Sequence, residues 1–140
     1  MPETTPMSAE DALCAIMIAV SASDETIRTS ELVEITTIVN TLPVFANYDE
    51  HKLSIIAQTV FDFFEQEDGL DALFGMVRGA LPDQLYETAY ALACDVAAAD
   101  GSLQQDEQRM LEEIRYELNI DRLAAAAIER GSRARHMTIS

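Results

Sequence analysis

Two short acidic stretches in this chain have the residue types and spacing of a cation-binding turn. Asp24 precedes Glu31 by seven positions, and Asp100 precedes Glu107 by the same interval. Hard divalent cations prefer several oxygen ligands, which carboxylates and the backbone carbonyls of a tight loop supply. If each aspartate ends one helix and each glutamate opens the next, the two carboxylates converge on one loop. The pattern therefore predicts a divalent-cation site, with calcium as the expected ion.

The two stretches are copies of one unit. A shift of 76 residues superposes the first Asp and Glu on the second pair, and both copies follow an alanine-rich segment. The same shift aligns four aliphatic pairs, which are Ile27 with Leu103, Ile35 with Leu111, Ile38 with Ile114 and Leu42 with Leu118. A duplicated helix–turn–helix unit could bring four carboxylates together across a pseudo-twofold axis.

Helix capping explains the same residues without a metal. A glutamate in the first turn of a helix often accepts the N–H of the N-cap residue, and a loop aspartate often accepts nearby backbone N–H groups. The duplication would repeat such caps as well, so both interpretations stay open. The second copy is the better candidate site, because Asp95 lies five residues before Asp100 whereas the matching position of the first copy is Ala19.

The charge of the chain excludes one class of partner. Acidic residues outnumber basic ones by 25 to 9, and the formal net charge is −16. Only Arg28, Lys52 and Arg78 are basic before position 109. Such a surface repels a phosphate backbone and attracts cations or basic protein surfaces. We therefore expect a protein partner and no nucleic acid.

Residues for covalent or acid–base catalysis are not arranged as a site. His51 lies beside Glu50 and Lys52 and His136 lies in the arginine-rich tail, so no Ser-His-Asp or Cys-His arrangement is visible. No Glu-x-x-His pair of a di-iron bundle occurs either. Cys14 and Cys94 lie in apolar runs, which indicates buried, reduced thiols and neither a disulfide nor a zinc site. We therefore expect that the protein is not an enzyme. The remaining enzymatic alternative is a metal hydrolase that uses the acidic turns.

Apolar residues recur every three or four positions, and the chain has only four prolines and five glycines. This periodicity predicts an all-α protein in which about seven helices share one core. Starting from a capping pair at Ser8 and Asp11, the expected helices cover about residues 8–23, 29–42, 47–68 (or 49–68), 70–80, 82–99, 105–118 and 121–128.

The domain limits follow from the same periodicity. We expect an N-terminal tail over 1–7, one helical domain over 8–130 and a loose basic tail over 131–140, where apolar periodicity ends. The start of the chain lacks the basic flank of a signal peptide, and its apolar run, Ala12 to Val20, is too short for a membrane span. The expected location is the cytoplasm, with contact to the inner membrane only through a partner.

The stretch ALACDVAAADGSLQQDEQRMLEEI resembles the motif-bearing helix pair of the TerB-like tellurite-resistance family, and the first copy resembles its degenerate first repeat. This resemblance implies a compact helical fold, an acidic face that binds divalent cations, and a role beside membrane-associated partners in tolerance of tellurite and other stresses. The family's acidic positions fall on the four repeat carboxylates and, less closely, on Asp95. Glu25 replaces the glycine expected after the first aspartate, so the second turn matches the family's metal-binding pattern better than the first.

Two functions fit these observations. In the first, the protein is an acidic interaction module that binds and senses a divalent cation, because a bound ion relieves charge repulsion and stiffens the helices beside the turns. In the second, it is a metal-independent acidic adaptor that docks on a basic or membrane-associated protein, and the turns serve only as caps.

Overall fold

The computed structural model describes residues 7–23, 27–99, 101 and 103–139. These residues form seven α-helices and two short 3-10 helices, with no strand among them, which confirms the predicted all-α class. The elements are α1 (Ala9–Ser21), α2 (Thr29–Thr41), η1 (Pro43–Phe45), α3 (Lys52–Phe64), α4 (Gly69–Ala80), η2 (Asp83–Leu85), α5 (Tyr86–Ala97), α6 (Gln105–Glu117) and α7 (Arg122–Arg135).

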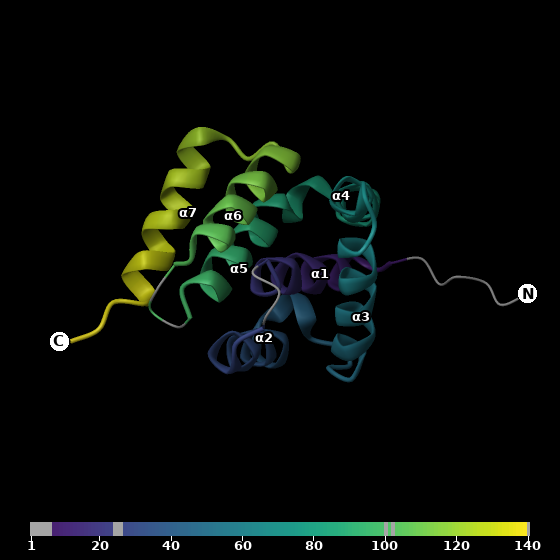
Figure 1. Cartoon of the computed structure of the whole chain (residues 1–140). Helices are drawn as coiled ribbons and strands as arrows, with labels where there is room; N and C mark the ends of the chain where they lie inside the picture. The colour runs from purple at the N-terminus through teal and green to yellow at the C-terminus, as the bar shows by residue number, and fades with distance from the viewer. Residues whose placement is uncertain (1–6, 24–26, 100, 102, 140) are drawn as a thin grey trace, which may run out of the picture.

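Helix α1 is the centre of the molecule. Every residue from Asp11 to Ala22 is buried, and α2, α3, α4, α5 and α6 all pack against this helix. Figure 1 shows α3 and α4 on one side of α1 and α6 and α7 on the other. A helix enclosed on all sides needs apolar residues all round, rather than along one stripe. The run ALCAIMIAV at residues 12–20 meets this need.

Asp11 anchors the start of α1. It closes the predicted capping box with Ser8, whose Oγ accepts the Asp11 N–H at 3.0 Å while Asp11 Oδ2 accepts the Ser8 N–H at 3.2 Å. Tyr48 donates its hydroxyl to Asp11 Oδ1 at 2.8 Å, and Lys52 Nζ lies 3.2 Å from the same oxygen. Burial alone would raise the pKa of Asp11, but the bonds from Tyr48, Ser8 and Lys52 hold it below its usual value.

Two helices begin later than the sequence predicts. Helix α3 begins at Lys52 instead of position 47 or 49, because the Asp49 side chain accepts the His51 N–H at 3.0 Å and holds a turn there. Helix α5 begins at Tyr86, since Pro82 precedes the 3-10 helix η2 rather than the first turn of α5 itself.

Helix α7 extends into the segment expected to be a loose tail, 131–140. It continues to Arg135, whose Nη2 lies 2.6 Å from Asp95 Oδ1 on α5. Ser132 is only 3% exposed and takes a buried position one turn after Ile128, so a polar residue hides the apolar period in the sequence. Basic residues in the last turn also favour the helix through its dipole.

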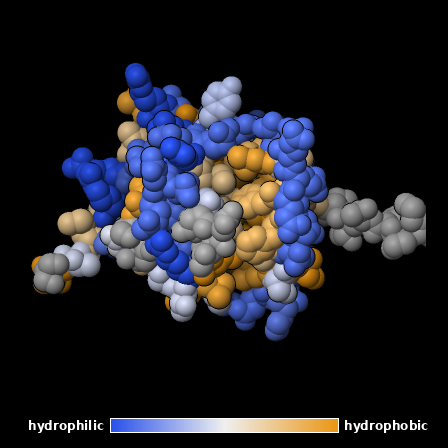
Figure 2. All heavy atoms as spheres, viewed as in Figure 1, coloured by the Kyte–Doolittle hydropathy of each residue, from blue (hydrophilic) through white to orange (hydrophobic). Residues whose placement is uncertain are grey.

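The surface facing the viewer in Figure 2 is mostly hydrophilic along the outer helices, with an apolar area between them. Within the described part of the chain, every helix is too short or too polar to cross a membrane.

We predict that Asp11→Asn lowers the free energy of unfolding by about 1–3 kcal/mol at neutral pH, because hydrogen bonds to a charged group are replaced by weaker ones. The folded-state pKa of Asp11 is depressed, so its contribution is full above the unfolded-state pKa and is lost as pH falls through the folded-state pKa. Urea denaturation should therefore show the difference from wild type shrinking in acid, below about pH 4.

The control is Glu65→Gln at an exposed position, which should change the free energy of unfolding by less than about 0.5 kcal/mol. A difference between Asp11→Asn and wild type that does not vary with pH would contradict the anchoring role of the charge.

Candidate functional site

Glu31 and Glu107 occupy equivalent places in the two copies of the repeat. Each is the third residue of its helix, α2 or α6, and each is 1% exposed. Glu31 Oε1 accepts the backbone N–H of Arg28 at 3.4 Å, and Glu107 Oε1 accepts that of Gln104 at 3.2 Å. Both glutamates therefore close a capping box, as the capping interpretation of the sequence requires.

The repeat is visible in the helix bounds as well. Helix α2 covers Thr29–Thr41 and α6 covers Gln105–Glu117, so a shift of 76 residues superposes both ends. In the preceding turns the copies differ. Ile27 packs against the core, whereas Leu103 is 50% exposed. Gly101 has a φ of 81°, in the left-handed region that glycine adopts without strain.

The two loop aspartates, Asp24 and Asp100, lie outside the described residues. Asp95 is described, and its side chain, 16% exposed, points toward α7 in the ion pair with Arg135. Within the described ranges no group of three or more His, Cys, Asp or Glu side chains is placed to hold a metal ion. The structure thus places Glu31 and Glu107 at matched helix starts, and it pairs Asp95 with Arg135 of the same chain.

The donor chemistry of the two glutamates fits a hard cation. A carboxylate has about four lone-pair sites, and the cap that Glu107 makes uses one of them. The C-terminal ends of α1 and α5 lead into the two turns, and the partial negative charge at a helix C-terminus favours cations. Glu107 could therefore offer an oxygen to calcium without giving up the cap, and Glu31 lies at the matched position of the other copy.

The two cysteines and the two histidines all lie within the described residues. Cys14 and Cys94 are buried and unbonded to each other, and burial raises the pKa of each to about 12, so neither is a reactive thiolate. His51 is exposed at the start of α3, and His136 follows α7. The expectation that both cysteines are buried is confirmed.

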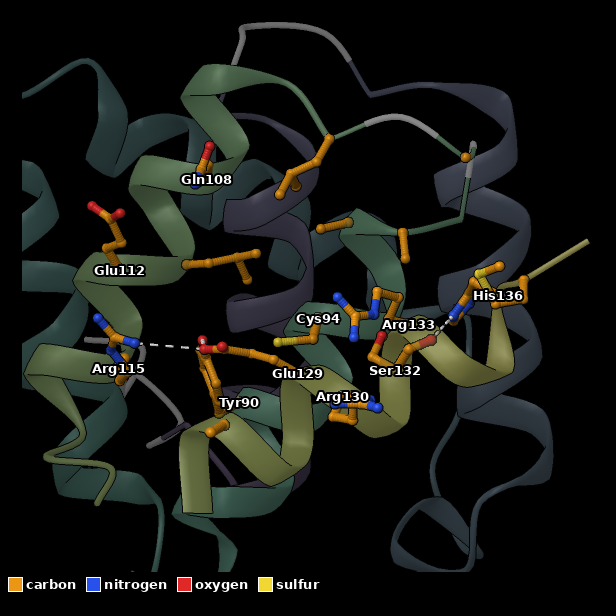
Figure 3. A pocket seen from close by; sticks show the side chains of 17 residues that line it. Tyr90, Cys94, Gln108, Glu112, Arg115, Glu129, Arg130, Ser132, Arg133 and His136 are labelled. Atoms are coloured by element: carbon orange, nitrogen blue, oxygen red, sulfur yellow. Dashed lines mark hydrogen bonds and ion pairs between the residues drawn. The ribbon is translucent and has the colours of Figure 1, made fainter. Parts of the chain in front are cut away.

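A groove between α5, α6 and α7 is not foreseen from the sequence. It has a volume of about 720 Å³ and is lined by an apolar floor and charged walls (Figure 3). Inside it, the Tyr90 hydroxyl donates to Glu129 Oε2 at 2.5 Å, and Arg115 Nη1 lies 3.6 Å from the same oxygen. Burial and this hydrogen bond raise the pKa of Tyr90 well above its usual value. The feature of the sequence that hints at this groove is the concentration of arginines between positions 122 and 135.

A family model described as Tellurite resistance protein TerB matches residues 10–130. The chain belongs to the TerB family. The matched range begins in α1 and ends in α7, so it covers both copies of the repeat and confirms the resemblance drawn from the second one. Neither the curated proteins nor the solved structures contain a match to this TerB chain.

In this TerB protein, we predict that Glu107→Ala lowers the free energy of unfolding by about 1–2 kcal/mol, since it leaves the Gln104 N–H without its acceptor. Glu107→Gln should cost less than half as much, because the amide oxygen still accepts that N–H. Chemical denaturation of both variants without added metal checks this. An equal loss in the two variants would mean that the charge, and not the cap, stabilises the helix start.

Proposed function

We propose that this TerB protein is an acidic helical module that binds a divalent cation, calcium first among them, at its duplicated turns. The observation that carries this proposal is the pair of buried glutamates, Glu31 and Glu107, at matched positions beside two acidic loops. A buried carboxylate is costly unless opposite charge or hydrogen bonds compensate it. Each glutamate already accepts one backbone N–H, and a cation held by the adjoining loop would add opposite charge.

The overall charge supports the same proposal. A chain with a net charge of −16 raises the local concentration of cations, and self-repulsion destabilises its compact state. An ion at each turn would offset part of that repulsion. It would also hold the end of one helix to the start of the next, α1 to α2 and α5 to α6. Binding of the ion would therefore stiffen the acidic surface around the two turns.

The biological role that we propose follows from the family description, which names tellurite resistance. In this proposal the cation-loaded face docks on a membrane-associated protein in the cytoplasm and contributes to tolerance of tellurite and other stresses. The second turn, with Asp100, Glu107 and the flexible Gly101, is proposed as the stronger site. The first turn, with Asp24 and Glu31, is proposed as the weaker one.

Thermal melting of the full chain with calcium, magnesium, manganese and zinc tests the metal. At a free calcium concentration of 100 Kd, a single site stabilises the protein by about 2.7 kcal/mol, which raises the Tm by about 5–10 °C. The double variant Glu31→Gln with Glu107→Gln keeps both caps and removes both charges, so its Tm should rise much less. A matched pair, Glu65→Gln with Glu67→Gln, removes two exposed charges and should respond as wild type does.

Two results would overturn the proposal. One is a Tm of wild type that none of the four metals changes. The other is a calcium-dependent rise in Tm that is as large in the Glu31→Gln, Glu107→Gln variant as in wild type, because the ion would then bind the general acidic surface.

A metal-independent acidic adaptor is the second candidate. It is favoured by the roles that three of the five candidate carboxylates already have, since Glu31 and Glu107 cap helices and Asp95 pairs with Arg135. These contacts hold the turns without an ion.

The two candidates differ in how chelation affects partner binding. If the adaptor proposal holds, affinity capture with the full chain should recover the same membrane-associated protein, in equal amount, in EDTA and in calcium. Recovery that falls at least about tenfold in EDTA would instead support the cation-dependent module, since each factor of ten corresponds to about 1.4 kcal/mol of coupling.

A further inference from the structure

Two grooves among the described residues lie at matched positions of the repeat. The first groove, of about 530 Å³, is lined by residues of α1, α2, α3 and their connections, and the second is the 720 Å³ groove between α5, α6 and α7. Nine of the ten residues that line the first groove shift by 76 positions onto residues that line the second. The exception is His51, whose counterpart Ala127 does not line the second groove.

This correspondence extends the repeat to a third helix. The sequence comparison relates α1 with α2 to α5 with α6, and the grooves add α3 and α7 as the remaining wall of each copy. The described chain thus contains two three-helix units, α1–α3 and α5–α7, with α4 between them. Each unit has a groove beside its acidic turn. The side chains at equivalent positions of the two grooves can therefore be compared directly.

The floors of the two grooves are alike. Ile35 of the first groove corresponds to Leu111 of the second, and Ile18 corresponds to Cys94. Burial raises the pKa of the Cys94 thiol, so it contributes an apolar, uncharged surface. Both grooves can therefore hold apolar groups.

The walls differ in charge. Ser54 and Ala57 on α3 correspond to Arg130 and Arg133 on α7, so the second copy has two cations where the first has none. Neither arginine forms an ion pair with any residue that the structure describes, and both are exposed. Figure 3 shows both arginines on the α7 wall of the groove.

The acidic residues of the second groove do not cancel these cations. Glu129 already accepts the Tyr90 hydroxyl and lies 3.6 Å from Arg115, which leaves it compensated. Glu112 is the remaining acid, so the lining holds three arginines against two glutamates. The groove is therefore net positive although the whole chain has a net charge of −16. At physiological salt, acidic residues more than about 8 Å away are largely screened, so they do little to weaken the attraction of the groove for anions.

We propose that the second groove binds an anionic amphiphile, which is a small molecule with one phosphate or carboxylate head and a short apolar tail. Arg130 and Arg133 would bind the head through charge-assisted hydrogen bonds, and Leu111 with Cys94 would contact the tail. The volume lies within the range of about 300–1,000 Å³ that ligand sites have. The apolar floor selects against bare inorganic anions, which gain nothing from it.

Such a head group has two sources, a free metabolite or a membrane lipid. Titration of the full chain with octyl phosphate, followed by calorimetry, tests the shared chemistry. Inorganic phosphate lacks the apolar tail, and the neutral octyl glucoside lacks the anionic head. Each should therefore bind at least about tenfold more weakly than octyl phosphate. Co-sedimentation with phosphatidylglycerol vesicles, against phosphatidylcholine vesicles, then tells the lipid from the free molecule, and either outcome supports the site.

The decisive variant is Arg130→Gln with Arg133→Gln, which should weaken octyl phosphate binding at least about tenfold. Its matched control is Arg109→Gln with Arg122→Gln. These two arginines are also exposed and also lack ion pairs among the described residues, but they lie outside the groove. The control should bind as wild type does.

Three results would overturn the proposal: no saturable binding of octyl phosphate to wild type, equal weakening by the control pair, or equally tight binding of inorganic phosphate or octyl glucoside. If the Arg130→Gln, Arg133→Gln variant does not fold, amide NMR shifts of wild type on addition of octyl phosphate replace it. Shifts centred on Gly101, Leu111 and Ala126 support the site, and shifts that avoid them refute it.

Discussion

The complete burial of α1 is the constraint on which the rest of the structure depends. A helix that is apolar all round must be enclosed, and five other helices are needed to do so. Its polar start must then be satisfied inside the protein, which Asp11 does by bonding Ser8, Tyr48 and Lys52 at once. The alanines of α1 and α5 are small, so the two central helices can pack closely.

Placing α1 and α5 at the centre also places the acidic turns. Each central helix ends where its turn begins, and the next helix starts with a buried glutamate whose charge lies at the favourable, positive end of that helix. Capping and cation binding are therefore compatible demands on the same side chain. The two copies keep this geometry while their grooves differ, the first being uncharged along α3 and the second basic along α7.

Local features of the sequence predict local features of the structure. The Ser8 capping box and the matched glutamates involve partners within three residues, so spacing alone identifies them. The Asp95–Arg135 pair joins residues 40 positions apart, and no spacing rule anticipates it. The sequence prediction ends α7 too early and misses its groove for a related reason. Ser132 is buried because of how the helices pack and not because it is apolar. Leu53 and Glu129 line the two grooves at matched positions, but their side chains are unlike, so comparing the sequence with itself does not pair them.

Amide NMR of the full chain during a calcium titration tests cation binding at the turns most directly, because it locates the ion as well as detecting it. Saturable shifts should concentrate at residues 23–31 and 99–107, larger in the second segment, with the amides of Glu107 and Gly101 among those that move. Shifts that do not saturate, or that spread over exposed acids such as Glu65 and Glu67, would contradict a site at the turns.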